Sequence, residues 1–393
     1  MTLPFAIFSF SLFWGAAQFI MLPIQVQALD PAHQDSALAL VVGVGAVASM
    51  VSAPIAGAVT DRTRTRMGGR EPWLIAAALA TVVFSVLAGS AASISSLLLW
   101  IVALQVSTNF ILTPVSAYIP DRVPIARRGA FSAAYGAAQL MGTVIGQIVG
   151  AQFGGAVFFG YMVVSIVLAA LVITFALTNS QSNADVPRLP VRVRSILETF
   201  WVNPVRHPNF ALAFAGRFLL FTGAYPVQIY LLFILQDYIG LEDGALAVVP
   251  VLSLFDLVGV LTGTVAAGIL VQKLQRTRPL IYMAAGLISL GMLAPLISPT
   301  LESMIVCSLF SGLGLGIFLS VDLVLITLVL PAPDQAGKDL GIINITTTLP
   351  QTLGAVLGSI VIAGFGGYGA LLPFAIAATL GGASLLAFIR GVR

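Results

Sequence analysis

Long apolar stretches alternate with short polar loops along almost the whole chain. A helix needs about 20 apolar residues to cross the hydrocarbon layer of a bilayer, and charged residues together with Pro and Gly clusters mark where such stretches end. The sequence therefore predicts twelve membrane-spanning helices, at residues 4–29, 37–60, 73–92, 95–119, 131–152, 156–178, 209–236, 245–271, 279–297, 302–330, 340–363 and 370–389. The first stretch is too long for the core of a signal peptide and no basic segment precedes it, so we expect it to be retained.

The composition supports an integral membrane protein of the all-α class. Of 393 residues, 59% are hydrophobic and 8% are charged, and the mean hydropathy is +1.03, whereas soluble proteins contain about 25% charged residues. Twelve crossings would use roughly 240 residues, which leaves no room for a large soluble domain. These values exclude water-soluble enzymes, nucleic-acid-binding proteins and secreted disulfide scaffolds. The net charge of +3 is explained by basic loops, and the single Cys307 excludes an intramolecular disulfide.

The basic residues predict the orientation of the chain in the membrane. If both termini are cytoplasmic, 17 of the 18 Lys and Arg residues lie in the loops and tail on that side, and only Arg217 lies inside a span. The loops on the other side contain acids but no basic residue, namely Asp30, Asp35, Asp237, Glu242, Asp243 and Glu302. Cytoplasmic loops are enriched in Lys and Arg. We therefore expect a multi-pass protein of a bacterial-type inner (plasma) membrane, with both ends in the cytoplasm.

A polar stretch midway along the chain divides it into two halves. It runs from Asn179 to Asn209, and it predicts an N-terminal bundle at 1–178, a cytoplasmic linker at 179–208 and a C-terminal bundle at 209–393. Within the linker, apolar residues recur at helical spacing, at Val193, Ile196, Leu197, Phe200 and Trp201. This spacing favours either an amphipathic helix on the inner membrane surface or a merely ordered linker.

Two short patterns of the first half recur in the second half at almost the same offset. At an offset of 212 residues, the fifth and eleventh predicted helices share a pattern, at Gln139, Gly142 and Gly146 and again at Gln351, Gly354 and Gly358. At an offset of 211, a glycine followed by a basic residue recurs, at Gly57 and Arg62 and again at Gly268 and Lys273. The repeats predict two pseudo-symmetric six-helix bundles, an architecture used by alternating-access carriers.

The loop between the second and third predicted helices contains a distinctive basic motif. Residues 57–73 read G-A-V-T-D-R-T-R-T-R-M-G-G-R-E-P-W, which resembles the signature of the major facilitator superfamily. The D-R-T-R-T-R form followed by Pro-Trp is similar to the branch of glycoside-pentoside-hexuronide:cation symporters and sucrose transporters, as are residues 337–344 and 349–351, and Arg128-Gly129 also fits the superfamily. The resemblance implies the major facilitator fold and solute transport, with two bundles rocking about a central site.

The same loop suggests a conformational latch. Gly57 lets its helix approach a neighbour closely, and the carboxylate of Asp61 can accept hydrogen bonds from the N-terminus of a facing helix. In the family this acid meets the start of the eleventh helix and nearby arginines, which implies Leu340 to Ile343 and Arg122 or Arg128 here. The candidate latch residues are Gly57, Asp61, Arg62, Arg66, Arg122 and Arg128. Alternatively, the loop is a solvated basic segment that only sets topology.

Three ionisable residues lie inside the predicted spans, and all are in the second half. They are Arg217, Asp256 and Asp322. An ionisable group in a membrane span costs a few kcal/mol or more, so each is a functional candidate. At about 1.5 Å per residue, Arg217 and Asp322 lie at similar distances from the inner ends of their helices and could pair, whereas Asp256 lies nearer mid-membrane. We expect these groups to couple transport to protons, or else to form a buried pair that fixes helix packing.

Sodium coupling is disfavoured by a departure from the family pattern. Melibiose-type symporters use two acids on the second helix ahead of a proline. Aligning Pro54 with that proline puts Ser49 and Ala53 at the two positions. Proton coupling or facilitated diffusion is therefore preferred.

Neutral polar and aromatic side chains recur at helical spacing inside the spans. Amides both donate and accept hydrogen bonds, and aromatic rings can cover the apolar face of a sugar. The candidate solute-binding residues are Trp14, Gln18, Gln105, Asn109, Gln139, Tyr225, Gln228, Asn344 and Gln351. Such a lining suits a neutral polyhydroxylated solute, although each residue could instead form a hydrogen bond between helices.

We find no catalytic or metal-binding pattern, because both histidines, His33 and His207, lie in predicted loops and no His, Cys or Asp cluster has ligand spacing. We expect a monomeric, non-enzymatic transporter without cofactor or metal, whose partners are a small-molecule solute, protons and the lipid bilayer, and not nucleic acid. It would move a small neutral polar solute, such as a sugar or glycoside, by proton-linked or facilitative transport. The alternative is a proton-driven exporter of amphipathic compounds.

Overall fold

The structure is a computed structural model that describes residues 2–182, 208–274, 278–329 and 336–389. The chain forms two compact units, Met1–Val191 and Arg192–Arg393, whose boundary falls within the predicted linker. The residues of the predicted amphipathic helix lie outside the described part. Within the described ranges the chain is all-helical and contains no strand, which confirms the predicted fold class.

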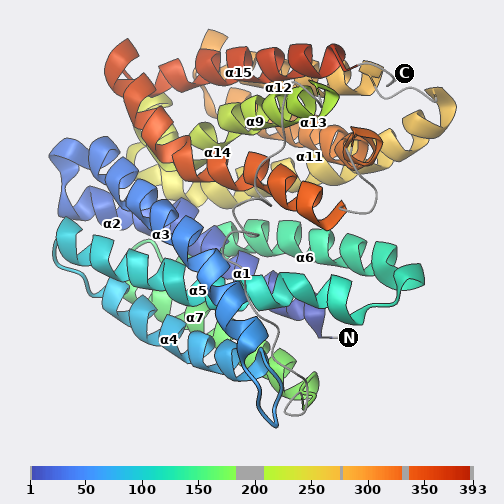
Figure 1. Cartoon of the computed structure of the whole chain (residues 1–393). Coiled ribbons are helices and arrows are strands. Elements are labelled where there is room, and N and C mark those ends of the chain that lie inside the picture. The colour runs from blue at the N-terminus through green and yellow to red at the C-terminus, as the bar shows by residue number, and fades with distance from the viewer. Residues whose placement is uncertain (1, 183–207, 275–277, 330–335, 390–393) are drawn as a thin grey trace. The chain divides into compact units, whose positions relative to one another are not determined.

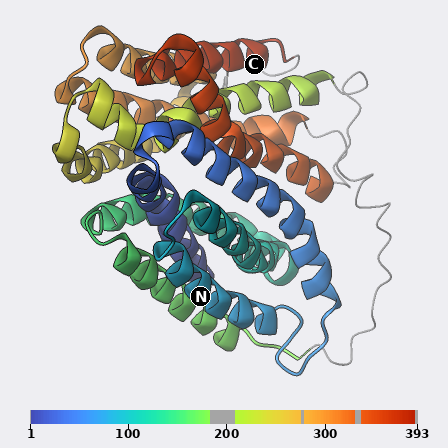
Figure 2. The ribbon, with the colours of Figure 1, turned by 90° about the vertical axis from the view of Figure 1, so that its left-hand side faces the viewer.

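The N-terminal unit contains six long helical segments (Figure 1). The first consists of α1 (Leu3–Ala16), a π-helical turn (Ala17–Met21) and α2 (Leu22–Leu29). The other five are α3 (Gln34–Arg62), α4 (Glu71–Gly89), α5 (Ile94–Arg122), α6 (Ile125–Gln152) and α7 (Val157–Thr178). Figure 2 shows these helices, coloured from blue to green, gathered into a bundle.

The C-terminal unit also contains six long segments. The first consists of α9 (Pro208–Ile229), the short α10 (Leu231–Phe233) and a π-helical turn (Ile234–Tyr238). The other five are α11 (Ala245–Leu274), α12 (Arg278–Ile297), α13 (Leu301–Val329), α14 (Ala336–Phe365) and α15 (Leu371–Ala387). Each predicted span therefore has a helical counterpart among the described residues.

The largest shift of a boundary is at the start of α6. This helix begins at Ile125, whereas the hydropathy predicted a span from residue 131. Hydropathy assigned Arg127 and Arg128 to a loop because they are charged, but a helix can continue beyond the hydrocarbon layer. Ten helices in the described part are long and apolar enough to cross a membrane, and neither α6 nor α14 as a whole is among them.

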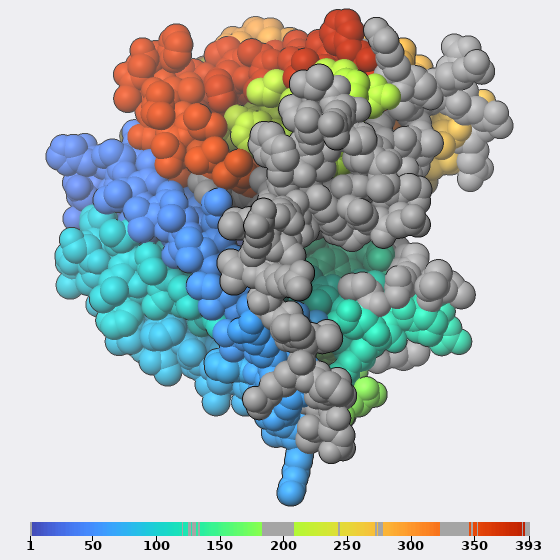
Figure 3. All heavy atoms as spheres, viewed as in Figure 1, coloured from blue at the N-terminus to red at the C-terminus, as the bar shows by residue number. Residues whose placement is uncertain are grey.

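Equivalent helices pack in equivalent pairs within each unit. In the N-terminal unit α1 packs on α6, α3 on α5 and α4 on α7, and in the C-terminal unit α9 packs on α14, α11 on α13 and α12 on α15. The space-filling view shows the blue surface of α3 adjoining the cyan surface of α5 at the left of the molecule (Figure 3). This correspondence supports the duplication inferred from the sequence repeats.

Glycines on α6 explain why this more polar helix packs so closely on α1. A Cβ at Gly146 would lie 2.3 Å from the carbonyl oxygen of Leu12, and one at Gly142 would lie 2.4 Å from that of Phe8. In the C-terminal unit a Cβ at Gly358 of α14 would lie 2.5 Å from the ring of Tyr230. The glycines of α6 therefore allow the backbones of α6 and α1 to approach closely, as small residues commonly do between membrane helices, and Gly358 leaves room for the ring of Tyr230.

Candidate functional site

A charged pair lies inside two apolar helices of the C-terminal unit. Arg217 is on α9 and Asp322 is on α13, and Nη1 of the arginine donates a hydrogen bond to Oδ2 of the aspartate. Their side chains are only 12% and 7% exposed. This is the contact that their similar depth in the sequence suggested. The positive charge of Arg217 and the negative charge of Asp322 attract each other, which stabilises both groups away from water, and the pair has no net charge.

Aromatic side chains of α9 and α13 lie beside this pair. The guanidinium of Arg217 is 5.5 Å from the ring centroid of Phe221. Phe221 in turn stacks on Tyr225 with 5.8 Å between centroids, and meets Phe318 of α13 edge to face at 6.0 Å. Tyr225, a predicted solute-binding residue, therefore belongs to an aromatic group that extends from the ion pair along α9.

The remaining candidates of the C-terminal unit are placed differently. Gln228 and Gln351 are half-buried, on α9 and α14. Asp256 is half-buried on α11. Among the described residues, it forms no ion pair with Arg217, whose partner is Asp322. The side chain of Asn344 lies outside the described residues. The structure therefore joins two of the three intramembrane charges and separates the third.

The polar candidates of the N-terminal unit do not all gather at one place. Gln18 is buried within the π-helical turn of the first segment, and π-helical turns are frequent at functional sites. Trp14 and Gln105 are half-buried, whereas Gln139 is exposed. Among the described residues, we find no hydrogen bond, ion pair or ring contact between any two of these four side chains.

Asn109 links α5 to α3. Its amide Nδ2 lies 2.8 Å from Oγ of Ser49 and 3.1 Å from Oγ of Ser52, and 2.8 Å from the carbonyl oxygen of Gln105. The side chain is buried. Asn109 therefore forms hydrogen bonds between helices in this structure. This was the alternative to solute binding in the sequence analysis.

A chain of charges connects the ends of α3 and α5 in the N-terminal unit. Arg70, just before α4, places Nη2 2.8 Å from Oδ1 of Asp61 and Nη1 2.5 Å from Oδ2 of Asp121. Burial lowers the pKa of Arg70, but hydrogen bonds and the charges of the two aspartates outweigh burial and raise this pKa above its ordinary value. The side chain of Asp61 remains 61% exposed.

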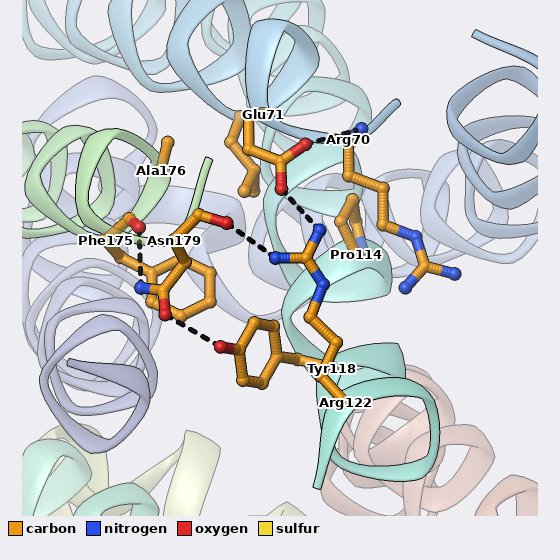
Figure 4. A pocket seen from close by; sticks show the side chains of 9 residues that line it. Arg70, Glu71, Pro114, Tyr118, Arg122, Phe175, Ala176 and Asn179 are labelled. Carbon is orange, nitrogen blue, oxygen red and sulfur yellow. Dashed lines mark hydrogen bonds and ion pairs between the residues drawn. The ribbon is translucent and has the colours of Figure 1, made fainter. Parts of the chain in front are cut away.

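A second group of contacts holds the ends of α4, α5 and α7 together around a small pocket (Figure 4). Arg122, the last residue of α5, places Nη2 2.9 Å from Oε1 of Glu71 and donates from Nη1 to the carbonyl oxygen of Asn179 at 2.5 Å. The hydroxyl of Tyr118 donates to Oδ1 of Asn179 at 2.7 Å. Glu71 is almost fully buried, with 6% of its side chain exposed.

These contacts place the predicted latch residues. Asp61 pairs with Arg70, whereas Arg122 pairs with Glu71 on the neighbouring helix. Arg62 and Arg66 are exposed. A Cβ at Gly57 would meet Thr113 at 3.5 Å, an ordinary contact. The side chains of Arg128 and of Leu340 to Ile343 lie outside the described residues.

The candidates named from the sequence did not include five residues of these two groups, namely Arg70, Glu71, Tyr118, Asp121 and Asn179. One signal was present in the sequence, because Arg70-Glu71 and Asp121-Arg122 are adjacent pairs of opposite charge at the ends of apolar stretches. No group of three or more His, Cys, Asp or Glu side chains in the described part has the proximity to hold a metal ion.

Comparison with known proteins identifies the family. Residues 3–303 match the family described as Major Facilitator Superfamily, and no curated protein matches the chain. Among solved structures, a variant of the nucleoside transporter NupG has a TM-score of 0.75 at 12% identity, with 99% of both chains covered.

Two further solved structures have the same fold. A D-xylose-proton symporter has a TM-score of 0.68 at 16% identity, with 99% of this chain and 97% of that chain covered. A bacterial homolog of the human lysosomal transporter Spinster has a TM-score of 0.67 at 13% identity, with 99% and 95% covered. Identities this low establish the fold alone.

Proposed function

The chain belongs to the Major Facilitator Superfamily, and from this we propose that it is a secondary transporter that moves a small neutral polar solute, a sugar or glycoside, in a proton-linked manner. It is a multi-pass membrane transporter and not an enzyme. The solute class, the proton linkage and the alternating-access mechanism are the parts that we propose. We also place the protein in the inner membrane as a monomer with both termini in the cytoplasm.

The neutral pair of Arg217 and Asp322 supports a neutral solute. Each charge is already matched by the other, so a charged solute would have to displace one partner and leave the other buried without a counter-charge. Leaving one charge of a buried pair without its partner costs about 3–5 kcal/mol. A hydroxylated neutral solute avoids this penalty. This buried pair is the observation on which the proposal mainly rests.

The aromatic group next to the pair suits a sugar. Phe221 and Tyr225 present stacked rings adjoining the guanidinium of Arg217, and a sugar ring has an apolar face that packs on aromatic rings and hydroxyls that hydrogen-bond to polar groups. Similarity to a D-xylose-proton symporter is compatible with this assignment. So is the resemblance of the D-R-T-R-T-R loop to the glycoside-pentoside-hexuronide:cation symporters.

We assign the latch to Asp61 and its partners. Asp61 is the exposed member of its pair with Arg70, so it can exchange partners at little cost, because exposed ion pairs contribute only about 0–1 kcal/mol. Arg122 and Glu71 instead form the buried link, which we assign to holding the helix ends together.

Transport into reconstituted vesicles tests the proposal. Purified protein is placed in proteoliposomes with an imposed pH gradient, and accumulation of a panel of labelled sugars and glycosides is measured with and without a protonophore. We expect at least one of these solutes to accumulate and the protonophore to abolish accumulation. Extrusion of amphipathic dyes, with no labelled sugar or glycoside moved, would instead establish the exporter alternative.

A further inference from the structure

Asp256 lies on the packed face of α11. The neighbouring positions of this face, Leu252, Ser253, Gly259 and Val260, are all buried, and α11 packs mainly on α13. Gly312 of α13 lies directly opposite, since a Cβ there would be 3.0 Å from Oδ1 of Asp256 and 2.2 Å from its carbonyl oxygen. The carboxyl group is thus held against a neighbouring apolar helix.

Asp256 lies at a different depth from the ion pair. It is 18 residues from the end of α11 at Leu274, or about 27 Å at 1.5 Å per residue. Arg217 is 9 residues from the start of α9 at Pro208, or about 14 Å. Because successive spans run in opposite directions, these two helix ends belong to the same side of the membrane. Asp256 is therefore too deep to share the Arg217 guanidinium.

The groups around Asp256 provide no counter-charge. On α13 the thiol of Cys307 is buried, but a thiol carries no positive charge. The other ionisable side chains described on α11 and on the helices that pack on it belong to Lys273, Arg278, Tyr282, Glu302 and Asp322. Asp322 is in the ion pair, and the other four lie toward the ends of their helices. Glu242 lies in the short helix before α11. Among the described residues, none forms an ion pair with Asp256.

The two acids therefore differ in what protonation does. Protonating Asp322 would leave the charge of Arg217 buried without its partner, which is strongly unfavourable. Protonating Asp256 removes a charge that has no partner, and a neutral carboxyl is far less costly to keep inside a membrane span than a carboxylate. Proton binding thus relieves an electrostatic penalty at Asp256 and creates one at Asp322.

We propose that Asp256 is the proton-binding site of this transporter and that Asp322 remains ionised in its pair with Arg217. This proposal rests on the proposed proton-linked transport and names the residue that carries the proton. Binding and release of the proton at Asp256 would change the charge at the interface between α11 and α13. Because Gly312 has no side chain, the carboxyl group lies directly against the backbone of α13 there.

Labelling with dicyclohexylcarbodiimide tests the proposal on the wild-type protein. This membrane-permeant reagent adds to protonated carboxyl groups and does not react with carboxylates. Purified protein in lipid vesicles is treated at a series of pH values, and the modified residues are identified by mass spectrometry of peptides. We expect Asp256 to be labelled, less so as the pH rises, and Asp322 to stay unmodified. Labelling of Asp322, or no pH-dependent labelling of Asp256, would overturn the proposal.

Transport by variants adds a second readout. One proton per solute sustains about tenfold accumulation across a gradient of about one pH unit. In Asp256→Asn we expect this ratio to fall to about one, because no proton is carried, while exchange of labelled for unlabelled solute continues. Ser253→Ala, which changes a buried polar residue one turn away, should keep the wild-type ratio. Tenfold accumulation by Asp256→Asn would refute the assignment.

The experiments distinguish failure of the proposed transport function from failure of the proton-site assignment. If the wild-type protein moves no solute of the panel, the proposed function is wrong, but carbodiimide labelling still reports which carboxyl binds the proton. If solute accumulates and Asp256 is unmodified at every pH, transport stands and the assignment of Asp256 is wrong.

Discussion

The two arginine links at the helix ends of the N-terminal unit should differ in strength. Arg122 contacts the almost fully buried Glu71, and Arg70 contacts the exposed Asp61. Charges 2.9 Å apart, the distance between Arg122 and Glu71, attract by about 6 kcal/mol at an effective dielectric constant of about 20. Desolvation of the buried carboxylate cancels a large part of this attraction.

We expect a net coupling of about 2–3 kcal/mol between Glu71 and Arg122. This is below the roughly 3–5 kcal/mol lost when a fully buried pair is broken, because 28% of the Arg122 side chain is exposed. The Asp61–Arg70 pair has a similar distance of 2.8 Å, but its carboxylate is 61% exposed. Its coupling should be about 0.2–1 kcal/mol, the range of surface pairs.

Double-mutant cycles measure both couplings. One cycle combines Glu71→Gln with Arg122→Gln, and the other combines Asp61→Asn with Arg70→Gln, with the free energy of unfolding of purified protein in detergent as the readout. Added salt should weaken the Asp61–Arg70 coupling more, since exposed charges are screened more strongly. If the two couplings are equal, or the Asp61–Arg70 coupling is larger, the assignment of a buried link and an exposed latch is refuted.

Three further predictions concern packing and charge burial. Gly146→Ala should destabilise the protein by about 1–3 kcal/mol through overpacking, because its Cβ would meet the α1 backbone, whereas Gly136→Ala on the same helix, with nothing within 4 Å, should be neutral or stabilising; equal thermal shifts would contradict this. Gly68→Ala should lower the unfolding temperature, because Gly68 has a φ of +113° and its Cβ would lie 2.0 Å from Oε2 of Glu71; an unchanged unfolding temperature would count against it. Asp322→Asn should destabilise by about 3–5 kcal/mol, and combination with Arg217→Gln should restore part of the loss; additive losses in a thermal-unfolding series would show that the pair does not couple.

The helices and their repetition could be read from the sequence because those signals are local. A run of apolar residues predicts a span wherever it occurs. The recurrence of Gln139 and Gly146 as Gln351 and Gly358 indicated a duplication, and equivalent helices do pack in equivalent pairs in the two units. The location of Arg217 and Asp322 at similar depth was also available, since depth follows from the number of residues to the helix end.

Partners across helices were decided by tertiary structure. Whether Asp61 meets Arg70 or Arg122, and whether Asn109 faces Ser49, depends on the rotation of each helix about its axis and on the helix beside it. A sequence specifies rotation only through the contrast between apolar and polar faces. In membrane helices that contrast is weak, because lipid-facing and protein-facing residues are both apolar. Close packing of small residues and the pairing of buried charges therefore set the contacts that the hydrophobic pattern left open.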